Sequence, residues 1–187
     1  MCASSSLVSY LIQTIDDAAG EAFDKGAKIL GLAYPGGPLI DKFAASGDEN
    51  FHSFPISKVP GLDYSFSGIK TSLLYYLKKQ EKGMLERHRN DICASYQKGI
   101  MDSLFQKLTK ANTQYKPKSI ATAGGVSANS VLRERMVDFG NSQDIKSYIP
   151  SFEFCTDNAA MIAAAGAMVF DMKAYTPLES NLYTKWK

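Results

Sequence analysis

The segment Ala123-Gly124-Gly125-Val126-Ser127-Ala128-Asn129 lies between a run of small residues over 119–123 and an amphipathic stretch over 129–139. These flanks predict a short strand that is followed by a helix. Two glycines at such a junction let the backbone approach a ligand closely and leave N–H groups free to face an anion. The same pattern is also typical of a plain tight turn. We therefore expect an α/β chain, and the glycines alone leave their role open.

The rest of the chain predicts more helices than strands. Tyr34-Pro35-Gly36-Gly37-Pro38 predicts a loop, because two prolines and two glycines fit neither a helix nor a central strand. Thr14 is the expected N-cap of the first helix and Thr156 that of the last. We expect helices over 14–32, 65–80, 84–112 (long or kinked) and 156–172, a second strand over 145–149 and an extended segment over 51–59.

Composition limits the class of protein. A chain of 187 residues with 45% hydrophobic and 21% charged residues suits one soluble domain with a sizeable core. The net charge of +2 is too small to mark a nucleic-acid-binding surface, so any RNA contact has to come from a local patch. Cys2, Cys93 and Cys155 show neither metal-type pairing nor a disulfide-type count. With no membrane span and no secretion signal, we expect a cytoplasmic location.

Two further blocks share the glycine and carboxylate character of the first. They are Asp16-Asp17-Ala18-Ala19-Gly20-Glu21-Ala22-Phe23-Asp24-Lys25 and Cys155-Thr156-Asp157-Asn158-Ala159-Ala160-Met161. The three blocks, in this order, resemble the TsaD family of tRNA threonylcarbamoyladenosine synthases, once called O-sialoglycoprotein endopeptidases or glycoproteases. The resemblance implies an α/β fold, the second lobe of an actin-like (ASKHA) ATPase, with an incomplete sheet and several helices.

The resemblance also implies a division of the chain. Residues 14–187 match the C-terminal lobe, whose final helix, here 156–172, normally joins the two lobes. Residues 1–13 form an atypical N-terminal segment with at most one strand, because Leu7-Val8-Ser9 lacks the glycines that the family has there. Contacts on the phosphate side of a nucleotide are therefore expected to be missing. Truncation and natural loss of the first lobe both stay open.

Four residues correspond to the family's contacts with its nucleotide-type substrate, namely Asp24, Gly37, Asp41 and Asn129. From the residues alone, Asp24 reads first as a solvated carboxylate paired with Lys25 or Lys28, although a carboxylate can also accept hydrogen bonds from ribose hydroxyls. The Asn129 carboxamide offers both a donor and an acceptor to an adenosine. The resemblance favours the ligand-binding interpretation for all four.

The family also implies a metal ligand at Asp157, which would complete an iron or zinc site with two histidines of the first lobe. This chain has only His52 and His88, and their spacing matches no metal motif. One carboxylate cannot hold a metal tightly, so we expect this chain to bind none. The residues alone favour Asp157 as a helix N-cap.

Asp63-Tyr64-Ser65-Phe66-Ser67-Gly68-Ile69-Lys70-Thr71 resembles another signature of the family. A serine nucleophile needs a base and an orienting group, and the chain offers neither in a recognisable pattern. Helix capping is the favoured role of Ser65 and Ser67, while Lys70 is read either as solvated or as facing substrate or RNA. We identify no acid or base catalyst, and no His-Glu-x-x-His motif supports a peptidase.

The resemblance implies transfer of threonylcarbamoyl from threonylcarbamoyl-adenylate to adenosine in tRNA, with TsaB-type and TsaE-type helper proteins, and we expect the chain alone to be inactive. A non-catalytic nucleotide-binding or partner-binding module is the alternative. A relative of acetate or sugar kinases is a third interpretation, but it lacks a visible general base and phosphate loop. Unpaired strand edges and an uncovered final helix also predict a homodimer.

Overall fold

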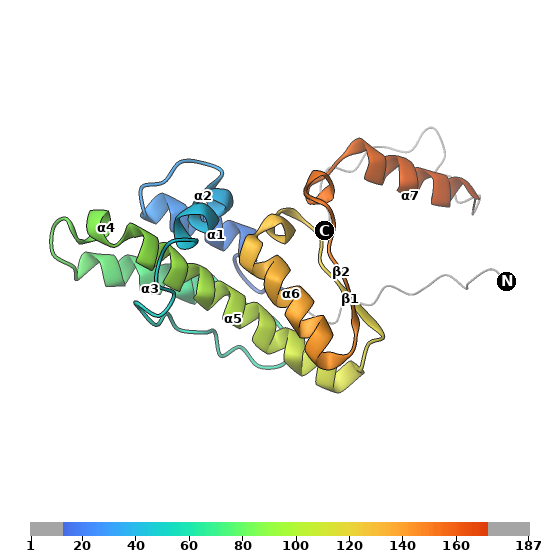
Figure 1. The fold of residues 1–187 in the computed structure, drawn as a ribbon, viewed down its shortest axis with the longest axis horizontal. Coiled ribbons are helices and arrows are strands. Elements are labelled where there is room, and N and C mark those ends of the chain that lie inside the picture. Colours follow the sequence, from blue (N-terminus) through green and yellow to red (C-terminus); the bar gives the residue numbers. More distant parts are fainter. Residues whose placement is uncertain (1–12, 172–187) are drawn as a thin grey trace.

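The computed structural model describes residues 13–171. Within this range, helices surround one long central helix and a very small sheet lies at one side (Figure 1). The mixed α/β class expected from the sequence is confirmed. The elements are α1 (Ala19–Ile29), α2 (Gly36–Ala44), α3 (Ser67–Lys78), α4 (Met84–Arg87), α5 (Arg89–Tyr115), β1 (Ser119–Ala121), η1 (Gly125–Ala128), α6 (Ser130–Gln143), β2 (Lys146–Tyr148), η2 (Phe152–Phe154) and α7 (Ala159–Asp171).

The central helix is α5, and the kink expected within 84–112 is found at His88, between α4 and α5. Its middle turns are buried, including Tyr96 and Ile100. The helix ends at Tyr115 because Lys116 adopts a left-handed conformation, with φ of 46°, directly before Pro117. A proline cannot continue a helix, so this end is set locally by the sequence.

The first helix, α1, lies against α5 at a glycine, which has no side chain to hold the two helices apart. A Cβ atom at Gly26 would lie 2.3 Å from the Tyr96 ring, so only glycine permits this approach. The Tyr96 hydroxyl donates a 2.8 Å hydrogen bond to the carbonyl of Ala22, which fixes α1 along α5 as well as toward it. Because the ring is fully buried, desolvation raises the pKa of Tyr96.

The expectation that Thr14 caps the first helix is wrong. The helix begins at Ala19, and Thr14 instead forms an isolated parallel bridge with Tyr64. The backbone N–H of Tyr64 donates to the carbonyl of Gln13, and the N–H of Ile15 donates to the carbonyl of Tyr64. A partner about 50 residues away therefore holds this segment extended where the local sequence predicted a helix.

The loop predicted over 34–38 is also wrong, because α2 begins inside it at Gly36. Pro38 is the third residue of the helix, where no backbone N–H is needed for an intrahelical bond. The Asp24 carboxylate accepts a 2.8 Å hydrogen bond from the N–H of Gly36. Local propensity favoured a loop, but the Asp24 carboxylate on the preceding helix accepts the first N–H of α2, so the helix begins here.

The remaining elements follow the predictions in part. The helix predicted over 65–80 is confirmed as α3, and the one over 129–139 as α6. The strands β1 and β2 are confirmed, and they pair in parallel, with Ile120 opposite Ser147. No strand forms over 51–59. Within the described residues the sheet has two strands, so each has one unpaired edge.

The last helix, α7, stands away from the other elements (Figure 1). It is rich in alanine, none of its side chains is buried, and Ile162 is 73% exposed. Thr156 is not its cap, because the Asn158 carboxamide oxygen accepts the hydrogen bond from the N–H of Met161. No helix within residues 13–171 has the length and apolarity that crossing a bilayer requires.

The contact between α1 and α5 leads to a stability prediction. Replacing Gly26 with alanine forces a Cβ atom into the Tyr96 ring, and we expect this overpacking to cost about 1–3 kcal/mol of unfolding free energy. Gly68→Ala in α3 is the matched control, since a Cβ there meets no atom within 4 Å. Urea unfolding of the two variants measures the difference, and equal midpoints would contradict the packing described above.

Candidate functional site

The four residues expected to contact a nucleotide come from three elements that the fold brings together. Asp24 lies on α1, Gly37 and Asp41 lie on α2, and Asn129 is the residue that precedes α6. Hydrogen bonds connect these elements in a chain, from α1 to the start of α2 and from α2 to the start of α6. Elements about 100 positions apart in the sequence are thus tied together by hydrogen bonds.

Asp24 is not the solvated residue that the local sequence suggested. Its Oδ1 atom receives the Gly36 N–H, whereas Lys25 pairs with Asp17 and Glu21. Only the Oδ1 atom is engaged by a protein donor among the described residues, so the second oxygen remains able to accept a hydrogen bond. The carboxylate therefore fixes the start of α2 and still has an acceptor to offer.

The two glycines at the start of α2 have different surroundings. A Cβ at Gly36 would lie 2.4 Å from the Cβ of Ala27, so this glycine is required by packing. At Gly37 the nearest atom, the Cβ of Phe23, is 3.8 Å away, so the fold itself does not require glycine there. The backbone at Gly37 lies in the first turn, where N–H groups have no intrahelical acceptor and can face an anionic ligand.

Asp41 connects α2 to α6. Its carboxylate accepts hydrogen bonds from the Ser130 N–H at 3.0 Å and from the Ser130 hydroxyl at 2.7 Å. An acidic group at the N-terminus of α6 is favourable, because the first-turn amides carry partial positive charge. Ser130 was not singled out from the sequence, and its only local sign was its position directly after an N-cap residue.

Asn129 is the N-cap of α6. Its Oδ1 accepts from the Leu132 N–H at 3.0 Å, and its Nδ2 donates to the Gln97 carboxamide at 2.7 Å. The residue is 8% exposed. One N–H and one oxygen lone pair of the carboxamide remain, which is the donor and acceptor pair that the sequence analysis assigned to it.

The glycine pair at 124–125 lies beside these residues, at the rim of a different hollow. Gly124 has a φ of 82°, a conformation that favours glycine, and it precedes the turn η1. The hollow has a volume of about 360 Å³ and is lined mainly by apolar side chains, such as Phe105 and Met136, and by the backbone of 121–126. None of the four expected nucleotide contacts lines it.

The described residues do not assemble a metal centre around Asp157. No cluster of three or more histidine, cysteine or acidic side chains with ligand geometry occurs within residues 13–171. His52 stacks on Tyr76, and His88 lies 3.0 Å from an Asp91 oxygen, so each histidine has a packing role elsewhere. Asp157 is exposed before α7, and Asn158 takes the capping role expected of it.

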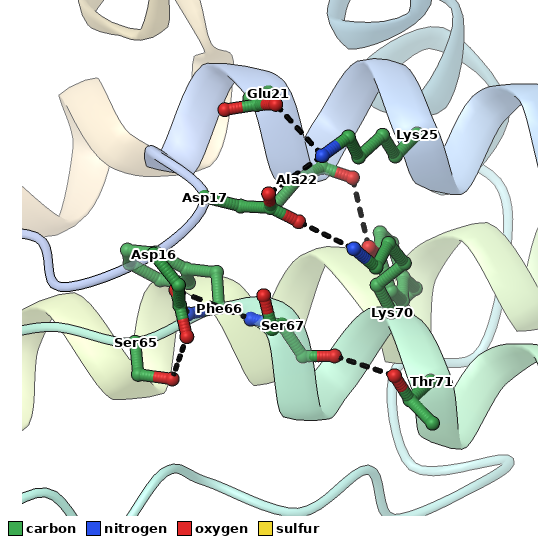
Figure 2. A network of polar contacts seen from close by, with 11 residues as sticks. Asp16, Asp17, Glu21, Ala22, Lys25, Ser65, Phe66, Ser67, Lys70 and Thr71 are labelled. Carbon is green, nitrogen blue, oxygen red and sulfur yellow. Dashed lines mark hydrogen bonds and ion pairs between the residues drawn. The ribbon is translucent and has the colours of Figure 1, made fainter.

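A second set of carboxylates, missed from the sequence, joins α1 to α3 (Figure 2). Asp17 bridges Lys25 at 2.6 Å and Lys70 at 2.7 Å. These two hydrogen bonds, that of Lys25 first and that of Lys70 second, lower the pKa of the Asp17 carboxyl. Lys70, which the sequence left as either solvated or ligand-facing, is thus engaged within the fold.

The serines do not cap α3 as expected, because Asp16 does so. Its Oδ1 accepts from the N–H groups of Phe66 at 2.8 Å and Ser67 at 3.4 Å, and Ser65 donates its hydroxyl to the other oxygen. Burial opposes ionisation of Asp16, but together the hydrogen bonds, led by that of Ser65, lower its pKa. This arrangement does not support a nucleophilic role for Ser65, since within residues 13–171 the only hydrogen-bond partner of its hydroxyl is the Asp16 carboxylate that caps the helix.

The Asp17 bridge predicts a pH-dependent stability. The folded-state pKa of Asp17 is depressed, so its contribution is present above the unfolded pKa, near 3.9, and disappears as the pH falls through the folded value. We expect Asp17→Asn to cost about 2 kcal/mol at pH 7, because two lysines lose a charged acceptor. Urea unfolding should show this difference from pH 7 to 5 and its progressive loss as the pH falls from about 4 through the lower folded pKa.

Glu21→Gln provides the control for that measurement. Glu21 contacts only Lys25, at an exposed position one helical turn away, so its replacement is expected to have little effect at any pH. A Glu21→Gln effect as large as that of Asp17→Asn would show that the bridge between α1 and α3 does not carry the stability.

Comparison with known proteins places this geometry in a family. The family model TsaD: tRNA N6-adenosine threonylcarbamoyltransferase matches residues 1–164. The chain is 47% identical over 178 residues to the tRNA N6-adenosine threonylcarbamoyltransferase of Christiangramia forsetii, covering 94% of this chain and 52% of that protein. It is 50% identical over 157 residues to the enzyme of the same name from Cytophaga hutchinsonii, covering 82% and 46%. The chain spans about half the length of the curated relatives that it matches, and it belongs to the TsaD family.

Proposed function

We propose that this chain contributes the second, nucleotide-facing lobe of an actin-like enzyme that transfers threonylcarbamoyl from threonylcarbamoyl-adenylate to the exocyclic amine of an adenosine in tRNA. The family membership and the names of the relatives support this activity. The observation that carries it onto this chain is a pair of hydrogen-bonded junctions: Asp24 accepts from Gly36 at the start of α2, next to the open backbone of Gly37, and Asp41 accepts from Ser130, the residue that follows Asn129.

In this proposal the cluster holds the adenylate end of the donor. The free oxygen of Asp24 accepts from the ribose hydroxyls, and the open turn at Gly37 lets the ligand approach the backbone. Asp41 keeps the start of α6 against α2, while Asn129 caps α6, bonds Gln97 of α5 and offers its remaining amide functions to the ligand. All of these groups bind and orient, and we assign no acid or base catalyst to this chain.

A metal belongs to the complete protein in this proposal. The family is metal-dependent, with iron or zinc as the expected ion, and Asp157 supplies one oxygen ligand. The residues described here do not fit a complete metal site, because Asp157 has no clustered His, Cys, Asp or Glu within 13–171. The histidine ligands would come from the first lobe. TsaB-type and TsaE-type proteins complete the proposed assembly.

The experiment is a transfer assay with tRNA and threonylcarbamoyl-adenylate, run with this chain alone and with a separately supplied first lobe. We expect no product from the chain alone, because the metal ligands and the phosphate-side contacts lie elsewhere, and product when the lobes are combined. Absence of product with both lobes, combined with retained nucleotide binding, would favour the alternative of a non-catalytic nucleotide-binding module.

Gly37 offers a direct test of ligand approach. We expect weak binding of ATP by the unchanged chain, with a calorimetric dissociation constant no tighter than roughly tens of micromolar. Gly37→Ala places a methyl group at an ordinary contact distance of 3.8 Å from the Phe23 Cβ, so folding is retained while close approach of a nucleotide is blocked. Gly68→Ala, where a Cβ meets no atom within 4 Å, is the control. Unchanged ATP binding by Gly37→Ala would show that the nucleotide does not approach the Gly37 backbone.

Assembly gives another prediction. The exposed apolar side chains of α7 and the unpaired edges of β1 and β2 are surfaces that proteins normally cover. In the absence of a first lobe we propose that two copies of the chain cover them by forming a homodimer. Light scattering at micromolar concentration should then give twice the chain mass, whereas a monomer at all concentrations would contradict the proposal.

A further inference from the structure

One stretch of the sequence carries basic residues with no acidic residue among them. Residues 103–133 contain Lys107, Lys110, Lys116, Lys118 and Arg133 but no aspartate or glutamate. The small net charge of +2 therefore conceals a strongly basic segment. Its four lysines lie in the C-terminal half of α5, at the turn that follows it and directly before β1, at one end of α5 (Figure 1), whereas Arg133 lies in α6.

A hollow lies where this half of α5 meets the irregular segment over 56–61. It has a volume of about 410 Å³, and its wall includes Lys58, Gln106, Lys107 and Lys110. Among residues 13–171, no carboxylate lies within 4 Å of the three lysine ammonium groups. Three cations without a neighbouring anion make this wall a region of positive potential.

Lys107 shows how the hollow is built. The residue is 7% exposed, and its ammonium donates to the carbonyls of Val59 at 2.6 Å and Gly61 at 2.9 Å. Lys110 donates to the same Gly61 carbonyl at 3.2 Å. These carbonyls accept the hydrogen bonds but do not cancel the charge, and an ammonium has three N–H groups. Lys107 thus fixes the segment and keeps an uncompensated cation in the wall.

The backbone of the same segment adds further donors. In the part of the chain that the structure describes, no hydrogen bond leads from the N–H groups of Ser57, Lys58, Val59 or Gly61 to a protein acceptor. Unpaired N–H groups next to cationic side chains are the combination that binds phosphate oxygens. The residues that carry these N–H groups also line the hollow.

We propose that this hollow and the basic segment beyond it bind the phosphodiester backbone of an RNA strand. The inference rests on the proposed function, in which tRNA is the acceptor, and adds which face of this chain receives it. An extended ligand is favoured over a single phosphate because the basic residues continue past the hollow. From Lys107 to Lys116, α5 rises about 14 Å at 1.5 Å per residue, which matches about four nucleotides at 3.4 Å each.

The test is the salt dependence of binding of an unmodified tRNA transcript, measured by fluorescence anisotropy without donor, metal or first lobe. We expect the Lys58→Ala/Lys110→Ala double variant to bind more weakly and to lower the slope of log affinity against log salt by roughly 1.5, since each lost phosphate contact removes about 0.7–0.9. Both lysines are exposed, so the fold is retained, and Lys107 is left unchanged because it holds the segment.

Lys79→Ala/Lys82→Ala is the matched control. It removes the same charge from exposed positions between α3 and α4, at the opposite end of α5, and it is expected to leave the slope unchanged. An equal loss in both double variants, or no measurable binding of the transcript by the unchanged chain, would overturn the proposal. The proposal would also be overturned if calorimetry showed that Lys58→Ala/Lys110→Ala loses the binding of inorganic phosphate but keeps the binding of RNA.

Failure here is separable from failure of the proposed function. The titration requires no chemistry, whereas the transfer assay reports on the donor site around Gly37. If the chain supports transfer together with a first lobe, but the slope of log affinity against log salt does not depend on Lys58 and Lys110, the proposed function stands and the proposed RNA-binding face does not.

Discussion

The contact between Gly26 and Tyr96 is the constraint on which the arrangement of the other helices depends. It lets α1 lie close against α5, and the hydrogen bond from the tyrosine hydroxyl to Ala22 fixes the position of α1 along that helix. The same device recurs where α2 meets α1, since a side chain at Gly36 would collide with Ala27. Two glycines thus set how closely three helices pack, and the candidate nucleotide site lies on the surface that this packing creates.

The carboxylates of that site serve the fold as well as the proposed ligand. Asp24 and Asp41 each accept hydrogen bonds from the first amides of a helix, and Asn129 caps α6. Helix N-termini expose amides that need acceptors, and the same amides suit an anionic ligand. Substitution of these side chains is therefore expected to change stability together with the proposed binding, whereas Gly37 separates the two because the packing does not require a glycine there.

The elements predicted correctly are those with clear periodicity. The helices over 65–80, 84–112 and 129–139 and the two short strands follow from it, whereas the position of the break at His88 and the end of α5 at Tyr115 came only with the structure. The start of α2 was not predictable in this way, because Asp24, twelve residues earlier, supplies its cap. For the candidate site, the family resemblance supplied the four positions, and their roles as ligand contacts remain a proposal.

The sequence by itself determined the α/β class, most helices and strands, and the family, because these depend on local patterns and on motifs with fixed spacing. The tertiary structure decided which carboxylates meet which amides. Asp16 caps a helix that starts 51 residues later, Asp17 bridges two helices through Lys25 and Lys70, and Asp41 reaches Ser130. Hydrogen-bond partners far apart in the chain leave no periodic trace in the sequence, because a short polar side chain fits a turn, a cap or a ligand equally well until packing supplies its neighbour.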